Sequence, residues 1–360
     1  MTKDPHAIVL GGGQSGLAAA HALLTRGLRP LVLEAGPEPV GSWPHYYDSL
    51  TLFSPARYSS LPGCPFPGDP EHYPHRDEVV AYLRRYAAAL DADIRTRHRA
   101  VAVTRDRDGF TVRTGHGDTF AAPALIAATG GFSQPRIPAL PGLDEFAGTV
   151  VHSSEYRNPA PFAGQRVIVV GAGNSAVQIA AELAEHARVT LATRAPIRFA
   201  PQRPFGRDAH WWTAALGLDH LPVGHLLSAP PATPVADPGR YQAAVAAGRP
   251  DRRPMFTRLD GDSVHWPNGT SEPADTIVLA TGFRPGLSYL DGTGALRDGI
   301  PLQRKGLSTT VPGLGYVGLE WQRSFASATL RGVGRDAAYL VDRLIGTPVS
   351  AGRRCCQPVS

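Results

Sequence analysis

Two short glycine-rich segments of this chain have the composition and spacing of loops that bind the phosphates of a dinucleotide. The first is Gly11-Gly12-Gly13-Gln14-Ser15-Gly16, and the second is Gly171-Ala172-Gly173-Asn174-Ser175-Ala176. In such a loop the first glycine allows a tight turn, the second lets the backbone approach a pyrophosphate, and a small third residue lets a helix pack on a strand. Two such loops in one chain predict two dinucleotides bound by one protein.

The first loop is flanked by an apolar run and by a segment rich in helix formers. Ala7 to Leu10 is suited to a buried parallel strand, and residues 14–24 favour a helix. A second apolar run, Leu31 to Leu33, ends in Glu34, at the distance where an acid accepts hydrogen bonds from a ribose 2′-hydroxyl. Because an acid repels a 2′-phosphate, this unit fits FAD or NAD and does not fit NADP. The alternative is a glycine turn that binds no ligand.

The second loop repeats this order but ends in a residue of opposite charge. Arg166 to Val170 predicts a strand, and Asn174 to His186 predicts a helix. The next strand, Val189 to Ala192, is followed by Thr193 and Arg194. An arginine at this place grips a 2′-phosphate through charge-assisted hydrogen bonds, so the second unit is interpreted as an NADPH site. The alternative is an ordinary surface arginine.

Two further apolar runs suggest that one nucleotide domain interrupts the other. Residues 124–130 and 275–282 each end in Ala-Thr-Gly, where a glycine permits close approach to a ligand or to a crossing linker. We therefore predict an α/β fold with two Rossmann-like dinucleotide-binding domains. An FAD domain (1–155 and 275–345) is interrupted by an NADPH domain (156–274), and 346–360 form a tail. Ser327 is expected to cap a last helix that reaches Leu344.

Composition excludes several classes of function. The chain has 360 residues, of which 42% are hydrophobic, and this is enough for two packed domains. The net charge of +5 comes from interspersed charges, without the concentrated patch that nucleic-acid binding needs. No apolar stretch has the length of a membrane span and no signal peptide opens the chain, so we expect a cytoplasmic protein, either a monomer or a homodimer.

The segment between the two loops resembles a family fingerprint. Its pattern, Phe146-x-Gly148-x-x-x-His152-x-x-x-Tyr156, is similar to that of the class B flavin-containing monooxygenases. The resemblance implies that NADPH delivers hydride to FAD and that O2 forms a flavin C4a-hydroperoxide. One oxygen atom then passes to a soft nucleophile of a small-molecule substrate, such as a sulfide, an amine or a trivalent arsenical. His152 is interpreted as a structural residue, and Tyr156 is expected to pack and hydrogen-bond there.

A finer resemblance points to one subgroup. Residues 53–63 and 322–332 are similar to a short bacterial subgroup often associated with arsenic-resistance operons. Adjacent thiols at Cys355 and Cys356 would suit trivalent arsenic, because soft thiolates bind soft ions, but they are also interpretable as an exposed pair without a role. Only Cys64 remains besides these two, so a disulfide framework is excluded. No resident metal site is predicted.

One departure from the family pattern concerns the hydroperoxide. Many members carry an asparagine near the flavin C4a atom, whereas this chain has Ser54 and Tyr58 as the candidate hydrogen-bond donors in that region. If neither stabilises the intermediate, the protein behaves as an NADPH oxidase or an electron-transfer reductase. A disulfide reductase is disfavoured because the chain has no Cys-x-x-Cys. A nucleotide-binding sensor without enzymatic activity is a further alternative.

The segment Gly41-Ser42-Trp43 is similar to the family segment that packs along the flavin, or else it simply packs Trp43 into the core. The residues expected to bind FAD or NADPH are Gly11, Gly13, Gln14, Ser15, Gly16, Glu34, Ala35, Gly36, Ser42, Trp43, Thr129, Gly130, Gly171, Gly173, Asn174, Ser175, Ala176, Thr193, Arg194, Thr281 and Gly282.

Overall fold

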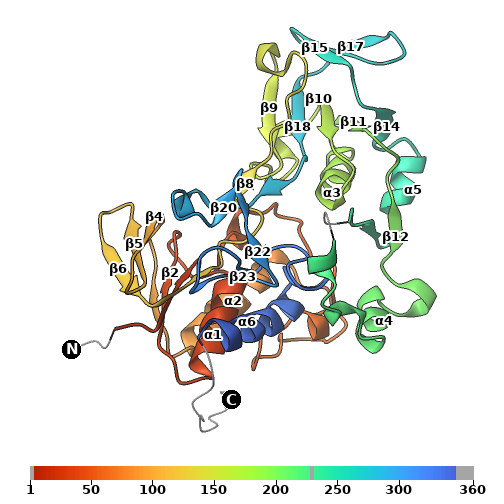
Figure 1. Cartoon of the computed structure of the whole chain (residues 1–360). Coiled ribbons are helices and arrows are strands. Elements are labelled where there is room, and N and C mark those ends of the chain that lie inside the picture. The colour runs from red at the N-terminus through yellow and green to blue at the C-terminus, as the bar shows by residue number, and fades with distance from the viewer. Residues whose placement is uncertain (1–3, 228–230, 346–360) are drawn as a thin grey trace.

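A seven-stranded sheet carries the first glycine loop (Figure 1). The computed structural model describes residues 4–227 and 231–345. The strand order is β22-β23-β24-β7-β1-β2-β3, and the five strands from β24 to β3 are parallel. Their bounds are β1 Ala7–Leu10, β2 Pro30–Leu33, β3 Asp93–Arg95, β7 Ala124–Ala127, β22 Gln303–Arg304, β23 Leu307–Ser308 and β24 Leu314–Tyr316.

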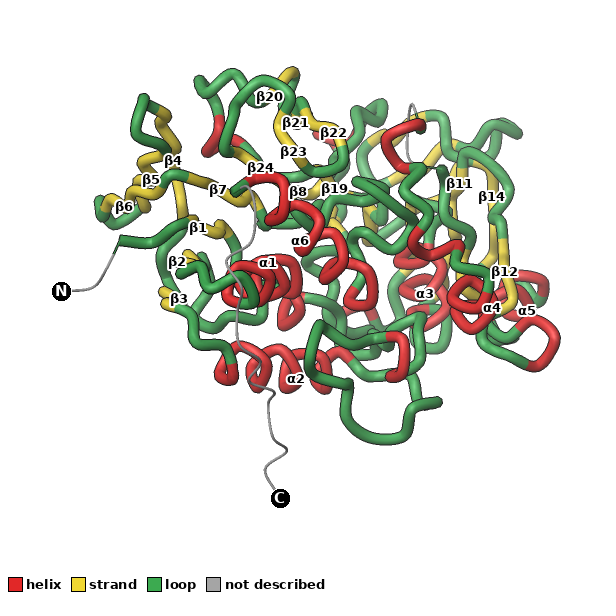
Figure 2. The backbone as a smooth tube through the Cα atoms, turned by 60° about the horizontal axis from the view of Figure 1, so that its bottom comes forward, coloured by secondary structure: helices red, strands yellow, loops and turns green. Residues whose placement is uncertain are grey.

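Successive side chains of β1 point to opposite faces of the first sheet, and each face packs against a different part of the protein. Ala7 and Val9 face a core shared with α1 (Gln14–Leu24), α2 (Arg76–Ala89) and α6 (Leu330–Leu344), which lie on one side of the sheet (Figure 2). Ile8 and Leu10 face the other way, toward an antiparallel sheet of β4 (Ala100–Arg105), β5 (Phe110–Thr114) and β6 (Thr119–Ala122). Because both faces are covered, the strand consists entirely of apolar residues.

A second, five-stranded parallel sheet carries the second glycine loop. Its order is β14-β11-β10-β18-β9. Helices α3 and α5 pack on one face, and the antiparallel strands β15, β16 and β17 cover the other. The bounds are β9 Thr149–His152, β10 Arg166–Val170, β11 Arg188–Thr193, β14 Asp251–Pro254, β15 Arg258–Asp260, β16 Ser263–His265, β17 Ser271–Pro273, β18 Thr276–Leu279, α3 Asn174–Leu183 and α5 Tyr241–Ala246.

The chain crosses between the two sheets at points that differ from the predicted boundaries. Strands β9 and β18 belong to the second sheet, although the predicted limits at 155 and 275 assigned both to the first domain. They are needed there because β18 covers the edge of β10 that β11 leaves open, and β9 covers β18 in turn. The two crossings instead run side by side as β8 (Gln134–Pro135) and β19 (Phe283–Arg284).

A segment that follows β11 leaves the second sheet and packs on the first unit. It contains β12 (Phe199–Pro201), paired with β13 (Val235–Asp237), and α4 (Ala209–Ala215). A small hairpin, β20 (Leu296–Arg297) and β21 (Ile300–Pro301), follows the second crossing. Between residues 4–227 and 231–345, no helix is long and apolar enough to cross a membrane.

The last helix begins later than the sequence suggested. Thr329 is the residue before α6, and Ser327 does not cap it. The hydroxyl of Ser327 instead accepts the backbone N–H groups of Arg323 (3.0 Å) and Ser324 (2.9 Å), which closes the turn ahead of the helix. The predicted tail, with Cys355 and Cys356, lies outside the described residues.

Candidate functional site

The first glycine loop is built so that only glycine fits at its two ends. Gly11 has a φ of +103°, and a Cβ atom there would lie 2.7 Å from the carbonyl oxygen of Ala128. A Cβ atom on Gly16 would lie 1.7 Å from the carbonyl oxygen of Gly11. Helix α1 begins at Gln14 without a side-chain cap, so the N–H groups of its first turn are free to bind phosphate.

Glu34 closes the mouth of this loop. Its buried carboxylate accepts the backbone N–H of Gly12 through Oε2 (2.5 Å) and that of Gly36 through Oε1 (2.6 Å). These bonds fix the carboxylate at the carboxyl end of β2 and leave each oxygen a further lone pair. Ala35 follows within the same turn. The arrangement fits a ribose whose 2′-hydroxyl donates to Glu34.

Two distant segments complete the crevice at the start of α1. Gln14 donates to the carbonyl of Ala328 (2.7 Å) and accepts the indole N–H of Trp43 (3.2 Å). A Cβ atom on Gly41 would lie 2.8 Å from Cα of Gly13, so the segment that contains Ser42 and Trp43 lies against the loop. Contacts between residues this far apart in sequence hold the N-terminus of α6 near that of α1.

Ser15 and Ser42 contact residues outside the first glycine loop. A Cβ atom on Gly318 would lie 2.0 Å from Oγ of Ser15, so the turn after β24 lies directly against the first turn of α1. The hydroxyl of Ser42 lies 3.3 Å from that of Tyr46. The predicted FAD residues of the first unit therefore gather around one helix N-terminus.

The Ala-Thr-Gly strand ends lie at the crossings. Thr129 hydrogen-bonds to Tyr289 (3.1 Å), and the adjacent Gly130 has open space where a Cβ would stand. Thr281 donates to the carbonyl of Arg136 (2.5 Å). The backbone N–H of Arg136 donates in turn to the carbonyl of Gly282 (2.9 Å). The second strand end thus fixes the β8–β19 ladder, whereas the first leaves room for a ligand.

The fingerprint residues stabilise the second sheet. His152 lies with Nε2 3.1 Å from the carbonyl of Gly282 and packs edge-on against Phe283, at 4.9 Å between ring centroids. Burial lowers the pKa of His152, which favours the neutral ring. Tyr156 is buried and donates to Glu182 (2.7 Å), so its expected packing and hydrogen bonding are confirmed. None of these contacts places His152 to transfer a proton to a substrate.

The second glycine loop is more open than the first. Gly171 has a φ of +147°, and a Cβ atom there would lie 2.4 Å from the carbonyl oxygen of Ala280. Gly173 has no atom within 4 Å of an added Cβ, and Ala176 fills the third position without conflict. Helix α3 begins at Asn174 with Ser175 in its first turn and no side-chain cap, while Asn174 accepts the N–H of Ala236 (2.9 Å).

Two arginines lie at the carboxyl end of β11. Arg194 is exposed, and within residues 4–227 and 231–345 it forms no ion pair. Thr193 is buried and accepts Nε of Arg252 (2.9 Å), a residue of β14 that sequence reasoning missed. Two guanidinium groups at one strand end fit the 2′-phosphate of NADPH. Arg252 was missed because only the order of strands in the sheet shows that β14 lies next to β11.

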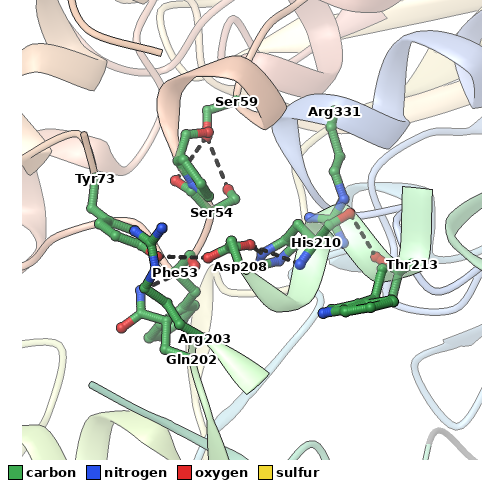
Figure 3. A network of polar contacts seen from close by, with 12 residues as sticks. Phe53, Ser54, Ser59, Tyr73, Gln202, Arg203, Asp208, His210, Thr213 and Arg331 are labelled. Atoms are coloured by element: carbon green, nitrogen blue, oxygen red, sulfur yellow. Dashed lines mark hydrogen bonds and ion pairs between the residues drawn. The ribbon is translucent and has the colours of Figure 1, made fainter. Parts of the chain in front are cut away.

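The two catalytic candidates contact Ser59 and the segment after β12. Ser54 shares a hydrogen bond with Ser59 (2.9 Å between the hydroxyl oxygens), within one tight turn (Figure 3). The ring of Tyr58 lies 6.4 Å from that of His210 on α4. Gln202 donates to the carbonyl of Phe53 (3.3 Å), which brings the segment after β12 onto this turn.

A buried polar network docks that segment on the first unit. Asp208, only 3% exposed, accepts the hydroxyl of Tyr73 (2.6 Å) and the backbone N–H of His210 (2.7 Å) (Figure 3). Burial disfavours the charge of Asp208, but these hydrogen bonds outweigh it and keep its pKa below the usual range. Arg331 of α6 binds the buried carboxylate of Asp219 through two bonds of 3.0 Å. Sequence reasoning missed this network because its members lie far apart in the chain.

The described residues show no group of three or more His, Cys, Asp or Glu side chains arranged to hold a metal ion. The predicted thiol pair, Cys355 and Cys356, lies outside the part of the chain that the structure describes.

Several known proteins are similar to this chain in sequence. The family model of the pyridine nucleotide-disulphide oxidoreductases matches residues 8–205. An uncharacterized CzcO-like oxidoreductase of Geobacillus kaustophilus is 31% identical over 94% of this chain and 97% of its own. An indole-3-pyruvate monooxygenase of the YUCCA type from Oryza sativa subsp. japonica is 33% identical over 83% of this chain and 82% of its own.

Solved structures have the same overall fold. A flavin-containing monooxygenase from Stenotrophomonas maltophilia has a TM-score of 0.83 at 33% identity, covering 95% of this chain and 98% of its own. A bacillithiol disulfide reductase from Bacillus cereus shares the fold, with a TM-score of 0.72 at 22% identity over 94% of this chain and 98% of its own. The predicted α/β fold with two dinucleotide-binding domains is confirmed.

Proposed function

The chain belongs to the class B flavin-containing monooxygenases, which use FAD and NADPH, and on this premise we propose its reaction and the roles of its residues. The protein transfers one oxygen atom of O2 to a soft nucleophilic atom of a small molecule, such as the sulfur of a sulfide or the nitrogen of an amine. A trivalent arsenical is a further candidate, which rests only on the similarity of residues 53–63 and 322–332 to an arsenic-associated subgroup.

The observation that carries this proposal is the opposite charge after the second strand of each unit. Glu34, held by the N–H groups of Gly12 and Gly36, suits the unphosphorylated ribose of FAD. Arg194 and Arg252, at the end of β11, suit the phosphorylated ribose of NADPH. The first unit therefore binds FAD and the second binds NADPH, which assigns an electron donor and an electron acceptor to defined halves of the molecule.

The residues of the chain bind and orient these groups. When bound, FAD supplies the redox chemistry, taking two electrons from NADPH and passing them to O2. The free N–H groups of α1 and α3 hold the two pyrophosphates, and Trp43, fixed by Gln14, packs beside the first loop. His152 keeps the β8–β19 crossing in place through Gly282 and takes no part in proton transfer.

The test is NADPH oxidation in air by the purified, FAD-loaded protein across sulfides, amines, ketones and trivalent arsenicals, with product and hydrogen peroxide measured in parallel. We expect oxygenated product in proportion to the NADPH consumed for at least one sulfide or amine. NADPH consumption that yields only peroxide with every substrate would contradict the proposal. Binding of FAD and NADPH without any consumption of NADPH would favour the sensor alternative.

A second candidate function, NADPH oxidase, is favoured by the geometry of Ser54. Its hydroxyl is engaged with that of Ser59 inside one turn, and so is poorly placed to donate to a flavin intermediate. Rapid mixing of the reduced protein with O2 separates the two functions. A transient absorbance of an oxygenated flavin supports the monooxygenase, and direct reoxidation without one supports the oxidase.

A further inference from the structure

A pocket of about 600 Å³ lies where the segment after β12 meets the first unit. Residues 57, 58 and 71 form one wall, and residues 203, 205–208 and 211 form the other. This volume is in the range of sites for small organic ligands, about 300–1,000 Å³. The pocket is next to the turn of Ser54 and Ser59 and belongs to neither glycine loop. The pocket is thus lined by residues other than those of the two glycine loops.

The pocket lining has three arginines against two carboxylates, Glu71 and Asp208, an excess of one positive charge, and Asp208 is already bonded to Tyr73 and His210. Glu71 pairs with Arg57 (2.8 Å) and lies 3.6 Å from Arg203, so one carboxylate faces two guanidinium groups. Arg207 lies over the ring of Trp211, at 4.5 Å from its centroid. Among the residues that the structure describes, Arg207 forms no ion pair with a carboxylate. An anionic ligand would therefore find a cationic group without having to displace an acid.

Aromatic rings give the same pocket flat apolar surfaces. Trp211 and Tyr58 line it, and Phe205 is 93% exposed with a φ of +53°, in the left-handed region that non-glycine residues rarely adopt. An exposed ring on strained backbone is an unfavourable arrangement unless something makes use of it. Rings beside an unpaired guanidinium match a ligand that has an aromatic group and an anionic group.

The floor of the pocket is rigid. Asp208 lines it and accepts the hydroxyl of Tyr73. Asp208 is also bonded to two nitrogens of His210, the backbone N–H at 2.7 Å and the ring Nδ1 at 2.8 Å (Figure 3). Because Arg207 and Asp208 are consecutive, this network also limits where the guanidinium of Arg207 can lie. A preorganised site loses less entropy on binding a ligand than a flexible one.

We propose that this pocket binds the carboxylate end of an aromatic substrate, with the carboxylate on Arg207 and the aromatic group against Trp211. The inference rests on the proposed oxygen-transfer function and narrows its substrate class to aromatic carboxylates. Neutral analogues bind more weakly, and cationic amines are disfavoured because the three arginines of the lining outnumber its two carboxylates and, within the described chain, only Arg207 of the three has no ion pair. For a sulfide of this class, the sulfur gains one oxygen of O2, and the other leaves as water with the two electrons of NADPH.

The test uses two sulfides that differ only in charge, 3-(phenylthio)propanoate and its primary amide. With the FAD-loaded protein at saturating NADPH, we expect the KM of the carboxylate to be at least tenfold below that of the amide. Arg207→Ala should raise the KM of the carboxylate about tenfold or more, the range for a hydrogen-bonded charge, with kcat unchanged. The KM of the amide and of NADPH should not change. Arg113→Ala, an exposed arginine on β5, is the matched control.

Calorimetric titration of both compounds separates this inference from the proposed function. If neither sulfide is oxygenated but the carboxylate binds at least tenfold more tightly and loses this advantage in Arg207→Ala, the pocket assignment holds and oxygen transfer fails. Equal affinities for the two sulfides would overturn the pocket assignment, whatever the activity. An increased KM for NADPH alone in Arg207→Ala would overturn it too, because the pocket would then serve the nucleotide.

Discussion

The two glycine loops follow the same order of strand, loop, helix and strand, but they differ in how tightly the protein itself fills them. In the first loop, Gly16 meets the carbonyl of Gly11 and Gly13 meets Gly41, and Glu34 bonds across the mouth. In the second, Gly173 borders open space and Arg194 has no partner in the described chain. The first loop is therefore the more tightly packed of the two, and the second has more open space beside its glycines.

This difference is what the proposed assignment, with FAD in the first loop and NADPH in the second, would require. FAD stays bound through many turnovers, so a loop held by contacts from residues 34, 41 and 318 suits it. NADPH must exchange in every cycle, so its charged ribose site is best exposed at a strand end. The two loops therefore differ less in their glycines than in the residues that pack against them.

The largest effect is expected from the third position of the first loop. A methyl group in Gly16→Ala would lie 1.7 Å from the carbonyl oxygen of Gly11, which is backbone and cannot rotate away. We expect a loss in the free energy of unfolding of about 3 kcal/mol or more, at the upper end for overpacking, together with loss of bound FAD. Chemical unfolding and flavin absorbance of the purified protein measure both.

The equivalent position of the second loop is the control. Ala176→Gly removes a buried methyl that already fits there, so helix preference and the burial of one methyl are lost, about 1–2 kcal/mol in all. If Gly16→Ala were as mild as Ala176→Gly, the first loop would not be the more tightly packed of the two.

The next effect concerns the charge at the end of β11. Arg194→Ala should raise the KM for NADPH about 10- to 100-fold, since hydrogen bonds to a charged group contribute about 1.5–3 kcal/mol. The KM for NADH, which lacks the 2′-phosphate, should stay the same. Arg252→Ala should act in the same direction but less strongly, because Thr193 holds Nε of Arg252 beside the strand. Steady-state kinetics with both nucleotides give the ratio.

Arg188, exposed at the other end of β11, is the matched control for Arg194 and Arg252. Arg188→Ala should leave both KM values unchanged. Equal losses for NADPH and NADH in Arg194→Ala would show that Arg194 does not read the 2′-phosphate.

Local sequence was enough to predict each strand, loop and helix around the glycines, because burial on both faces imposes continuous apolar runs. It did not assign β9 and β18 to the second sheet, because pairing between parallel strands leaves no local signal about which neighbour is chosen. The binding roles of the predicted loop residues stay predictions.

Contacts that depend on the packing of the folded chain were not predictable either. Arg252 acquires its place only through the register of β14 with β11, and Asp208 only through Tyr73, more than a hundred residues away. The expected cap at Ser327 was wrong because its hydroxyl serves the turn before the helix. Ser54 and Tyr58 were chosen from a resemblance, and the packing of the segment after β12 decides what they face.

A smaller effect tests the crossing that joins the two units. Burial lowers the pKa of His152 from its ordinary value of about 6.5, so the unfolded chain binds the proton more readily than the folded one. The contribution of neutral His152 is complete above pH 6.5 and is lost as the pH falls through the lower folded pKa. The free energy of unfolding should therefore decrease on acidification in wild type, and less so in His152→Gln.

Partial burial also lowers the pKa of His21, which contributes with the same sign, so the informative quantity is the difference between wild type and His152→Gln as a function of pH. Parallel curves for the two proteins would mean that His152 titrates normally.

The smallest effect on stability, and the sharpest contrast between the loops, is expected at their second glycines. A Cβ on Gly173 would have no atom within 4 Å, and its φ of −90° suits alanine, so Gly173→Ala should change the free energy of unfolding by less than about 0.5 kcal/mol. A Cβ on Gly13 would lie 3.2 Å from Cα of Gly41, so Gly13→Ala should cost more. Gly173→Ala should still weaken NADPH and NADH equally, because the methyl occupies the space of the pyrophosphate that both share. Unchanged affinity for both nucleotides in Gly173→Ala would place the pyrophosphate elsewhere and remove the functional meaning of the open loop.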